Sequence, residues 1–423
     1  MWCDLWYPGA APRHSFQSAG ALATGDTVRS NRVLSPSSRG SLFYLAYWGA
    51  VGVYMPFINI RFALLGLSGG QIGLISALLP LMTLTVAPAL AALADRRGIR
   101  TRILALTLAG MALALTLLNF PTTFEAIVPL MLLLALARSP VGPLGDSLVA
   151  RMAARHRLDF GAMRLWGSLG FAVVAILVGA IWQRVGYNLM FPITAALLVP
   201  VALSATLLEE GPVVEWAARR PFREVGRDRG LIAILAATFL MGASLGMDGA
   251  FQGIYVQHLG GGGFLVGALF GISAFSELPT MRYATALARR IGAPATLLLS
   301  YGLFEINYIG FALARDPLVL IPLTIIKGFG FGLFFASTVR IVDERTPPEW
   351  ASTVQAVMNA GAGGLAPLAA SLVGGAIYDA LGPASLYVAC STVVGLAILT
   401  LSLAAARGIF RGTPLRSGDQ RLG

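Results

Sequence analysis

Twelve long apolar segments follow one another along the chain, each about as long as a membrane-spanning helix. A helix needs about 20 residues to cross a hydrocarbon core about 30 Å thick. Because lipid offers no hydrogen-bond partners, the backbone N–H and C=O groups of each segment must bond to one another. Only 12% of the 423 residues are charged, against about 25% in a soluble domain. The pattern excludes an ordinary soluble protein and predicts an all-α membrane protein with twelve transmembrane helices. The segments cover residues 41–60, 71–94, 102–119, 126–150, 163–183, 188–208, 230–257, 264–288, 294–313, 317–339, 350–377 and 383–406.

Arginine is distributed unevenly between the connections of these segments. Cytoplasmic loops near helix ends carry an excess of Lys and Arg. Alternate connections are rich in arginine, whereas the opposite ones hold only Arg61, Arg184 and Arg315. We therefore expect a multi-pass protein of the plasma (inner) membrane with both termini cytoplasmic. Because the arginines are spread over many short loops, the net charge of +11 does not indicate nucleic-acid binding.

The two halves of the chain resemble each other. ALADRRG at 92–98 is echoed by ALARRIG at 286–292, and GAIWQRVG at 179–186 by GAIYDALG at 375–382, at offsets of 194 and 196 residues. Duplicated six-helix halves are typical of transporters whose site lies near the midplane and opens alternately to each side. The expected organisation is a disordered cytoplasmic tail (1–40), two pseudo-symmetric six-helix bundles (41–208 and 230–406), a cytoplasmic linker (209–229) and a cytoplasmic tail (407–423).

The stretch LADRRGIR at 93–100 resembles the G-x-x-x-D-R/K-x-G-R/K-R/K signature of the major facilitator superfamily, between the second and third segments. The resemblance covers residues 41–406 and implies the twelve-helix major facilitator fold. In that family the motif is a cytoplasmic gate latch, which here implies gate roles for Asp95, Arg96, Gly98 and Arg100. The alternative is a short turn that carries positive charge to the cytoplasmic side.

The fourth and fifth segments resemble the lactose permease branch, with its phenylpropionate and nucleoside proton symporters. The phrase FGAMRLWG at 160–167 carries the likeness. In lactose permease an acidic residue and an arginine at these places bind substrate, which implies that role for Asp146 and Arg164. Arg138, Trp166 and Tyr47 are further candidates for substrate binding. The alternatives are that Asp146 and Arg164 form an ordinary surface pair and that the aromatic side chains serve packing or the membrane interface.

The charges of the second half that are hardest to explain as surface groups lie inside apolar segments: Asp248, Glu277, Glu305 and Lys327. A lone charge at bilayer depth costs about 3 kcal/mol or more, so such groups face a wet interior and pair with one another. Asp248 and Glu277 are the candidate partners of Lys327. The lactose permease resemblance implies proton coupling by Glu277 and a pair of Asp248 with Lys327, although this chain lacks that permease's His and Glu after the lysine. The alternative is that the charges make purely structural pairs.

These observations predict a secondary transporter, a proton symporter of a small organic solute such as a sugar, nucleoside or aromatic acid. The expected partners are this solute, protons and the lipid bilayer, with no nucleic acid and a monomeric state. The alternatives are a proton-linked drug or metabolite efflux antiporter, a lipid-modifying membrane enzyme and a solute sensor. With the three histidines scattered along the chain and no H-E-x-x-H phrase, an enzyme is not expected. The two cysteines, Cys3 and Cys390, indicate neither a disulfide framework nor a metal cluster, and no cofactor or metal is expected.

Overall fold

The computed structural model describes residues 34–210 and 228–411. These ranges form two bundles with eleven apolar helical segments long enough to cross a membrane and a twelfth, shorter one, Met190–Ala205. The N-terminal bundle contains α1 (Pro36–Tyr54), α2 (Ile58–Leu64), α3 (Gly69–Arg97), α4 (Arg100–Leu117), α5 (Phe124–Arg138), α6 (Val141–His156), α7 (Phe160–Val185) and α8 (Met190–Ala205). The C-terminal bundle contains α9 (Arg229–His258), α10 (Gly263–Ile291), α11 (Ala293–Leu313), α12 (Leu320–Arg345), α13 (Pro348–Ala360), α14 (Ala366–Leu381) and α15 (Pro383–Ala406). The predicted all-α fold is confirmed.

Three of the predicted segments are interrupted helices. The first divides into α1 and α2 beside Pro56, and the fourth into α5 and α6 beside Pro140. Proline has no N–H to continue the helical ladder. The eleventh contains a π-helical turn, Gly361–Leu365, between α13 and α14. Neighbouring helices make such breaks tolerable inside a membrane protein.

The ends of the chain differ in detail from the sequence expectation. Helix α1 begins at Pro36, five residues before the predicted segment, because Ser35 caps it by accepting a hydrogen bond from the Ser38 N–H at 3.2 Å. The predicted tail 1–40 is therefore helical from residue 36. The described ranges do not include residues 1–33 of this tail, residues 211–227 of the predicted linker or residues 412–423 of the C-terminal tail.

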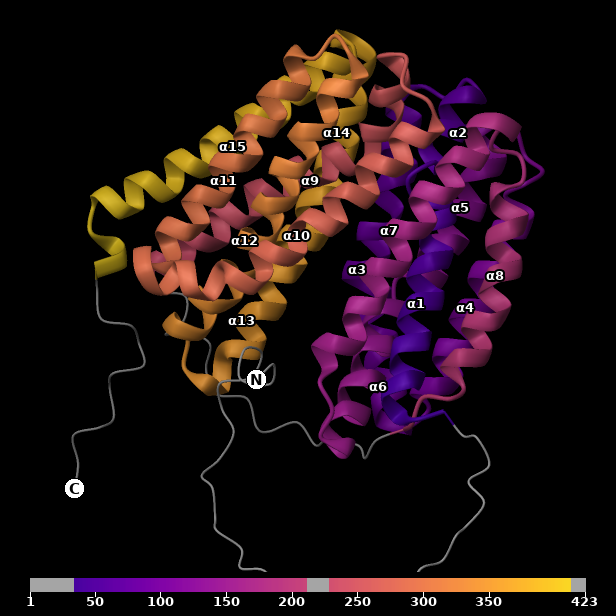
Figure 1. The fold of residues 1–423 in the computed structure, drawn as a ribbon, viewed down its shortest axis with the longest axis horizontal. Helices are drawn as coiled ribbons and strands as arrows, with labels where there is room; N and C mark the ends of the chain where they lie inside the picture. The colour runs from indigo at the N-terminus through magenta and orange to yellow at the C-terminus, as the bar shows by residue number, and fades with distance from the viewer. Residues whose placement is uncertain (1–33, 211–227, 412–423) are drawn as a thin grey trace, which may run out of the picture.

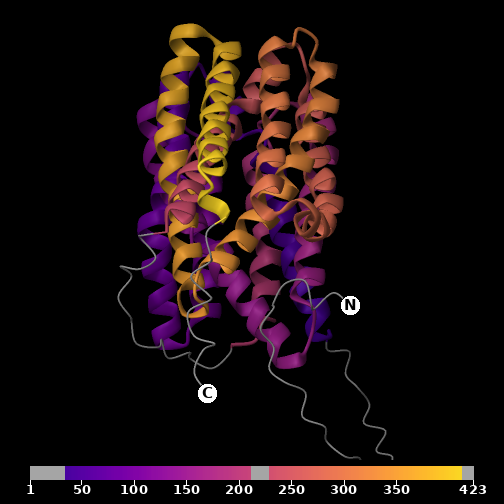
Figure 2. The same ribbon diagram turned by 90° about the vertical axis from the view of Figure 1, so that its left-hand side faces the viewer.

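The two bundles lean against each other at one side of the molecule. An even number of crossings puts the start of α1 and the end of α15 on the same side, here called the terminal side. The bundles come together at the opposite side and spread apart towards the terminal side (Figure 1). In Figure 2 the C-terminal bundle lies in front of the N-terminal one. Helices α7 and α10, and α3 and α14, make the main contacts between bundles.

Candidate functional site

Lys327 on α12 is held by two side chains of α9. Its Nζ donates to Asp248 Oδ2 at 2.6 Å and to Gln252 Oε1 at 2.9 Å. Asp248 and Gln252 lie four residues apart, so one helix face presents both. All three side chains are buried. Of the two candidate partners for Lys327, the structure therefore selects Asp248.

Glu305 lies apart from this pair, between α11 and α15. It accepts a hydrogen bond from the Ser391 hydroxyl. Tyr308, three residues further along α11, is fully buried and packs its ring against Tyr387 of α15, with ring centres 6.4 Å apart. Glu305 therefore belongs to the polar interior of the C-terminal bundle.

In the N-terminal bundle, Tyr44 of α1 joins the predicted substrate pair. Its hydroxyl donates to Asp146 Oδ1 at 2.6 Å, while the Arg164 guanidinium carbon lies 5.2 Å from the centre of its ring. Arg164 also lies 4.9 Å from the ring centre of Trp48, within the range of cation–π attraction. Among the described residues, no direct ion pair joins Asp146 to Arg164. Tyr44 links them instead.

Arg138, at the end of α5, lies against phenols of α1. Its guanidinium carbon is 5.8 Å from the centre of the Tyr54 ring, and it interacts with the Tyr47 hydroxyl. Tyr47 is stacked on Phe43, with ring centres 6.0 Å apart and an interplanar angle of 3°. Tyr47 and Arg138 thus come together as one cluster of a cation and neutral aromatic side chains.

Trp166 does not join this cluster. It is two residues from Arg164 on α7 and therefore points about 200° around the helix from it. Its side chain is 45% exposed. Trp48 of α1 occupies the place beside Arg164 instead.

One electrostatic interaction crosses from one bundle to the other at this level. Arg164 is on α7 and Glu277 on α10, two helices that pack against each other, so the Arg164 charge lies near enough to influence the Glu277 carboxyl group, although among the described residues no direct ion pair joins them. On its other side α10 meets α12 closely: a Cβ at Gly332 would lie 2.6 Å from the Glu277 carbonyl oxygen. This is the close helix contact expected of the glycines in α12. Glu277 and Arg164 thus bring the candidate residues of the two halves together.

Two residues of the predicted gate motif pair with each other. Arg100, fully buried, donates from Nε to Asp95 Oδ1. Gly98 ends α3 with φ +64°, a left-handed conformation that favours glycine. Arg96 is exposed. On this terminal side the bundles are spread apart (Figure 1), and a latch role for the motif stays a prediction.

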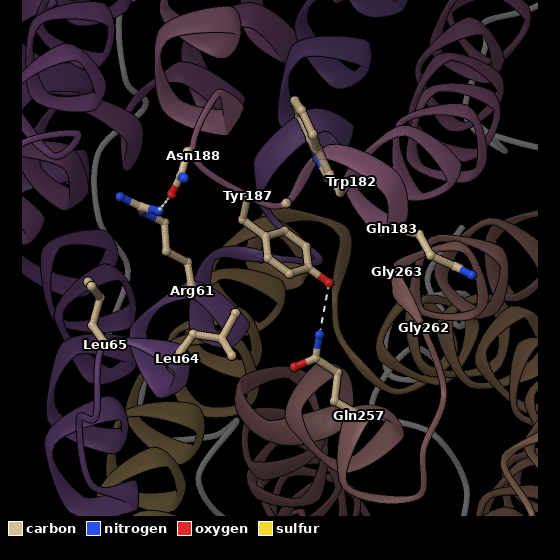
Figure 3. Close-up of a pocket in the computed structure, with 11 residues that line it drawn as sticks. Arg61, Leu64, Leu65, Trp182, Gln183, Tyr187, Asn188, Gln257, Gly262 and Gly263 are labelled. Atoms are coloured by element: carbon tan, nitrogen blue, oxygen red, sulfur yellow. Dashed lines mark hydrogen bonds between the residues drawn. The ribbon is translucent and has the colours of Figure 1, made fainter.

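A separate pocket of about 490 Å³ lies at the opposite side, between the bundles (Figure 3). Arg61 on its wall donates to Asn188 Oδ1 at 2.6 Å, and Gln257 Nε2 donates to the Tyr187 hydroxyl at 2.9 Å. None of the residues predicted for substrate or proton binding lines it.

A family model described as the MFS_1 like family matches residues 38–389. The chain belongs to this family. It is a transporter of the major facilitator superfamily and a multi-pass membrane protein; its relatives are transporters, not enzymes.

Two curated relatives and one solved structure are similar to this chain. The chain is 30% identical to a maltose permease of Geobacillus stearothermophilus over 368 residues, covering 85% of this chain and 93% of that protein. It is 27% identical to a probable 3-phenylpropionic acid transporter of Escherichia coli (strain K12) over 280 residues, covering 62% and 70%. The crystal structure of the nucleoside transporter NupG matches with a TM-score of 0.76 at 18% identity, covering 90% of this chain and 100% of that one. The structural similarity to NupG shows that this chain has the same fold.

Sequence reasoning about this transporter missed Tyr44, the residue that links Asp146 to Arg164. A signal was present, because Tyr44, Tyr47 and Trp48 are spaced three and four residues apart and so lie near one face of α1. Nothing in the sequence indicated which of these rings would meet which arginine. That depends on how α1 is rotated against α5 and α7.

Proposed function

We propose that this family member is a proton-coupled symporter that carries a small organic solute into the cell by alternating access. The placement of Arg164 on α7 and Glu277 on α10, two helices that pack against each other between the bundles, is the observation that carries the proposal. It brings a cation of one bundle near a carboxyl group of the other, at the interface that must change when one bundle rocks against the other. The electrostatic influence of Arg164 on Glu277 therefore changes both when a solute binds and when the bundles move.

Glu277 is the proposed proton carrier. A carboxyl group at bilayer depth is costly as an unpaired anion, so it holds a proton or a cationic partner. When the bundles move and Arg164 engages the solute, Glu277 loses part of its compensating charge and takes up a proton. The Asp248–Lys327 pair already compensates its own charges within the C-terminal bundle. Of the carboxyl groups predicted to couple protons, this leaves Glu277 as the one on α10, a helix that packs against the other bundle.

The proposed solute is a compound rich in hydroxyl or carboxylate oxygens. Arg138 and Arg164 supply donors for such oxygens, and the rings of Tyr44 and Trp48 supply flat apolar faces. Sugars, nucleosides and aromatic acids all match this chemistry, and the names of the relatives, which include maltose and 3-phenylpropionic acid, support these classes. Asp146, held by Tyr44, is the proposed acceptor for a solute hydroxyl.

The orientation is also part of the proposal. The arginine-rich connections lie on the terminal side, which we assign to the cytoplasm of a cell with the protein in its inner membrane. The conformation described here is then open towards the cytoplasm and closed towards the exterior.

The test uses purified protein in liposomes with radiolabelled maltose, uridine and 3-phenylpropionate. We expect at least one solute to accumulate when the exterior is made acidic. Glu277→Gln should abolish this accumulation while retaining exchange of labelled for unlabelled solute, because exchange needs no net proton movement. Glu125→Gln, a change at an exposed carboxylate in the first turn of α5, is the matched control. Equal loss of accumulation and exchange would assign Glu277 to structure, and solute export driven by an inward proton gradient would exclude symport.

A further inference from the structure

The repeated sequences at 179–186 and 375–382 form the ends of α7 and α14 on the side opposite the termini. Each stretch packs against the start of a helix in the other bundle: α7 against α10, and α14 against α3. The internal repeat of the sequence thus becomes two related contacts that close the same side of the molecule. This closure does not depend on the identity of the solute.

Glycines bring the backbones together at both contacts. A Cβ at Gly375 would lie 2.4 Å from the Gly69 carbonyl oxygen, and one at Gly179 would lie 2.6 Å from the Gly263 carbonyl oxygen. Real Cβ atoms do not approach backbone this closely. Neither helix pair can therefore hold a larger residue there without moving apart.

The residue four positions after each glycine reaches across to a helix N-terminus. Asp379 accepts hydrogen bonds from the Gly69 and Gly70 N–H groups, the first of α3, at 2.6 and 2.7 Å. Gln183, 196 residues earlier, accepts one from the Phe264 N–H, near the start of α10, at 3.0 Å. Each side chain thus caps a helix of the opposite bundle.

The two caps differ in chemistry. The carboxylate of Asp379 makes two charge-assisted bonds and meets the positive end of the α3 dipole. The amide of Gln183 is neutral and makes one longer bond. The pocket of about 490 Å³ lies beside Gln183 (Figure 3), so packing at the α7–α10 contact is also less complete.

We propose that Asp379 is the principal latch on the side opposite the termini. It holds this side closed by binding the α3 N-terminus across the bundle interface. Gln183 is its weaker counterpart. Opening this side to admit solute requires the Asp379 carboxylate to leave the Gly69 and Gly70 N–H groups. Asp379 therefore sets the balance between the two conformations without touching the solute.

The test measures the distance between spin labels placed on the two bundles at this side. Leu189 and Leu313 are 53% and 75% exposed; Leu189 directly precedes α8 in the N-terminal bundle and Leu313 ends α11 in the C-terminal bundle. The labels are attached at Leu189→Cys and Leu313→Cys in a protein that carries Cys3→Ser and Cys390→Ala, without solute. Asp379→Ala should raise the population with the longer distance about tenfold relative to the closed one, since losing a helix cap of this kind shifts an equilibrium about five- to thirtyfold. Gln183→Ala should shift it less.

Asp316→Ala is the matched control. Asp316 also caps a helix on this side, accepting from the Leu318 N–H at 2.8 Å, but within its own bundle. It should leave the distance distribution unchanged, and Asp379→Glu should restore most of the closed population. The proposal is overturned if Asp379→Ala, eluting as a folded monodisperse protein, gives the wild-type distribution, or if Gln183→Ala gives the larger shift. Because no solute or proton gradient is involved, either result is independent of the transport assay.

Discussion

At the scale of single residues, buried charge explains the most specific contacts in the molecule. Lys327 is the only lysine of the chain, and its ammonium is almost wholly enclosed by Asp248, Gln252 and their neighbours. Taking either charge out of water is costly, and only the partner offsets the cost. The position of this pair is therefore determined by electrostatics more than by helix packing.

We expect Lys327→Ala to destabilise the protein by about 3–5 kcal/mol, because it leaves the Asp248 carboxylate buried without its cation. The double variant Asp248→Ala/Lys327→Ala should recover most of this loss, since no unpaired charge remains. Thermal unfolding in detergent, followed by tryptophan fluorescence, measures both. A double variant as unstable as Lys327→Ala would show that the lysine stabilises the bundle through packing and not through its charge.

At the scale of elements, a cluster of charges joins three helix ends on the terminal side. Glu209, which follows α8, lies 3.0 Å from His156 Nε2 at the end of α6 and 3.5 Å from Arg39 NH1 at the start of α1. Arg155 is a further neighbour at 3.6 Å. The hydrogen bond from His156, together with these cations, lowers the pKa of Glu209. The cluster ties the N-terminal bundle together where the linker to the other bundle begins.

We expect Glu209→Gln to lower stability at neutral pH by about 1 kcal/mol or less, as for other partly exposed ion pairs. Because the folded-state pKa is depressed, the stabilisation is present above the unfolded value of about 4.3 and is lost as the pH falls through the folded value. Melting temperatures measured from pH 3.5 to 7.5 should therefore differ between wild type and Glu209→Gln at pH 7 and converge in acid. A difference that grows below pH 4.3 would contradict this, and Glu125→Gln should show no such convergence.

At the scale of the whole molecule, two similar bundles meet on one side and spread apart on the other (Figure 1). Glycine contacts and helix caps hold the closed side. On the terminal side Arg100 pairs with Asp95 of the same connection. The arrangement is one of the two end states that alternating access requires.

We expect the terminal side to be cytoplasmic, because its connections carry the excess of arginine. A green fluorescent protein fused after the C-terminus should therefore fluoresce, and alkaline phosphatase fused there should be inactive. The same phosphatase fused after Arg315, on an opposite connection, should be active. The reverse pattern would invert the orientation and with it the proposed direction of uptake.

The sequence by itself determined the all-α fold, the succession of apolar segments and the need of the buried Lys327 for an acidic partner, whereas the structure decided that this partner is Asp248 and not Glu277. The features determined by the sequence follow from the residues of each segment alone. Its backbone groups must hydrogen-bond within the segment in lipid, and each buried charge needs a partner. Only the tertiary structure decided that Tyr44 stands between Asp146 and Arg164, that Trp166 points elsewhere and that Asp379 caps α3. Such contacts depend on the rotation and separation of helices far apart in the chain, which packing fixes and apolar patterning leaves open.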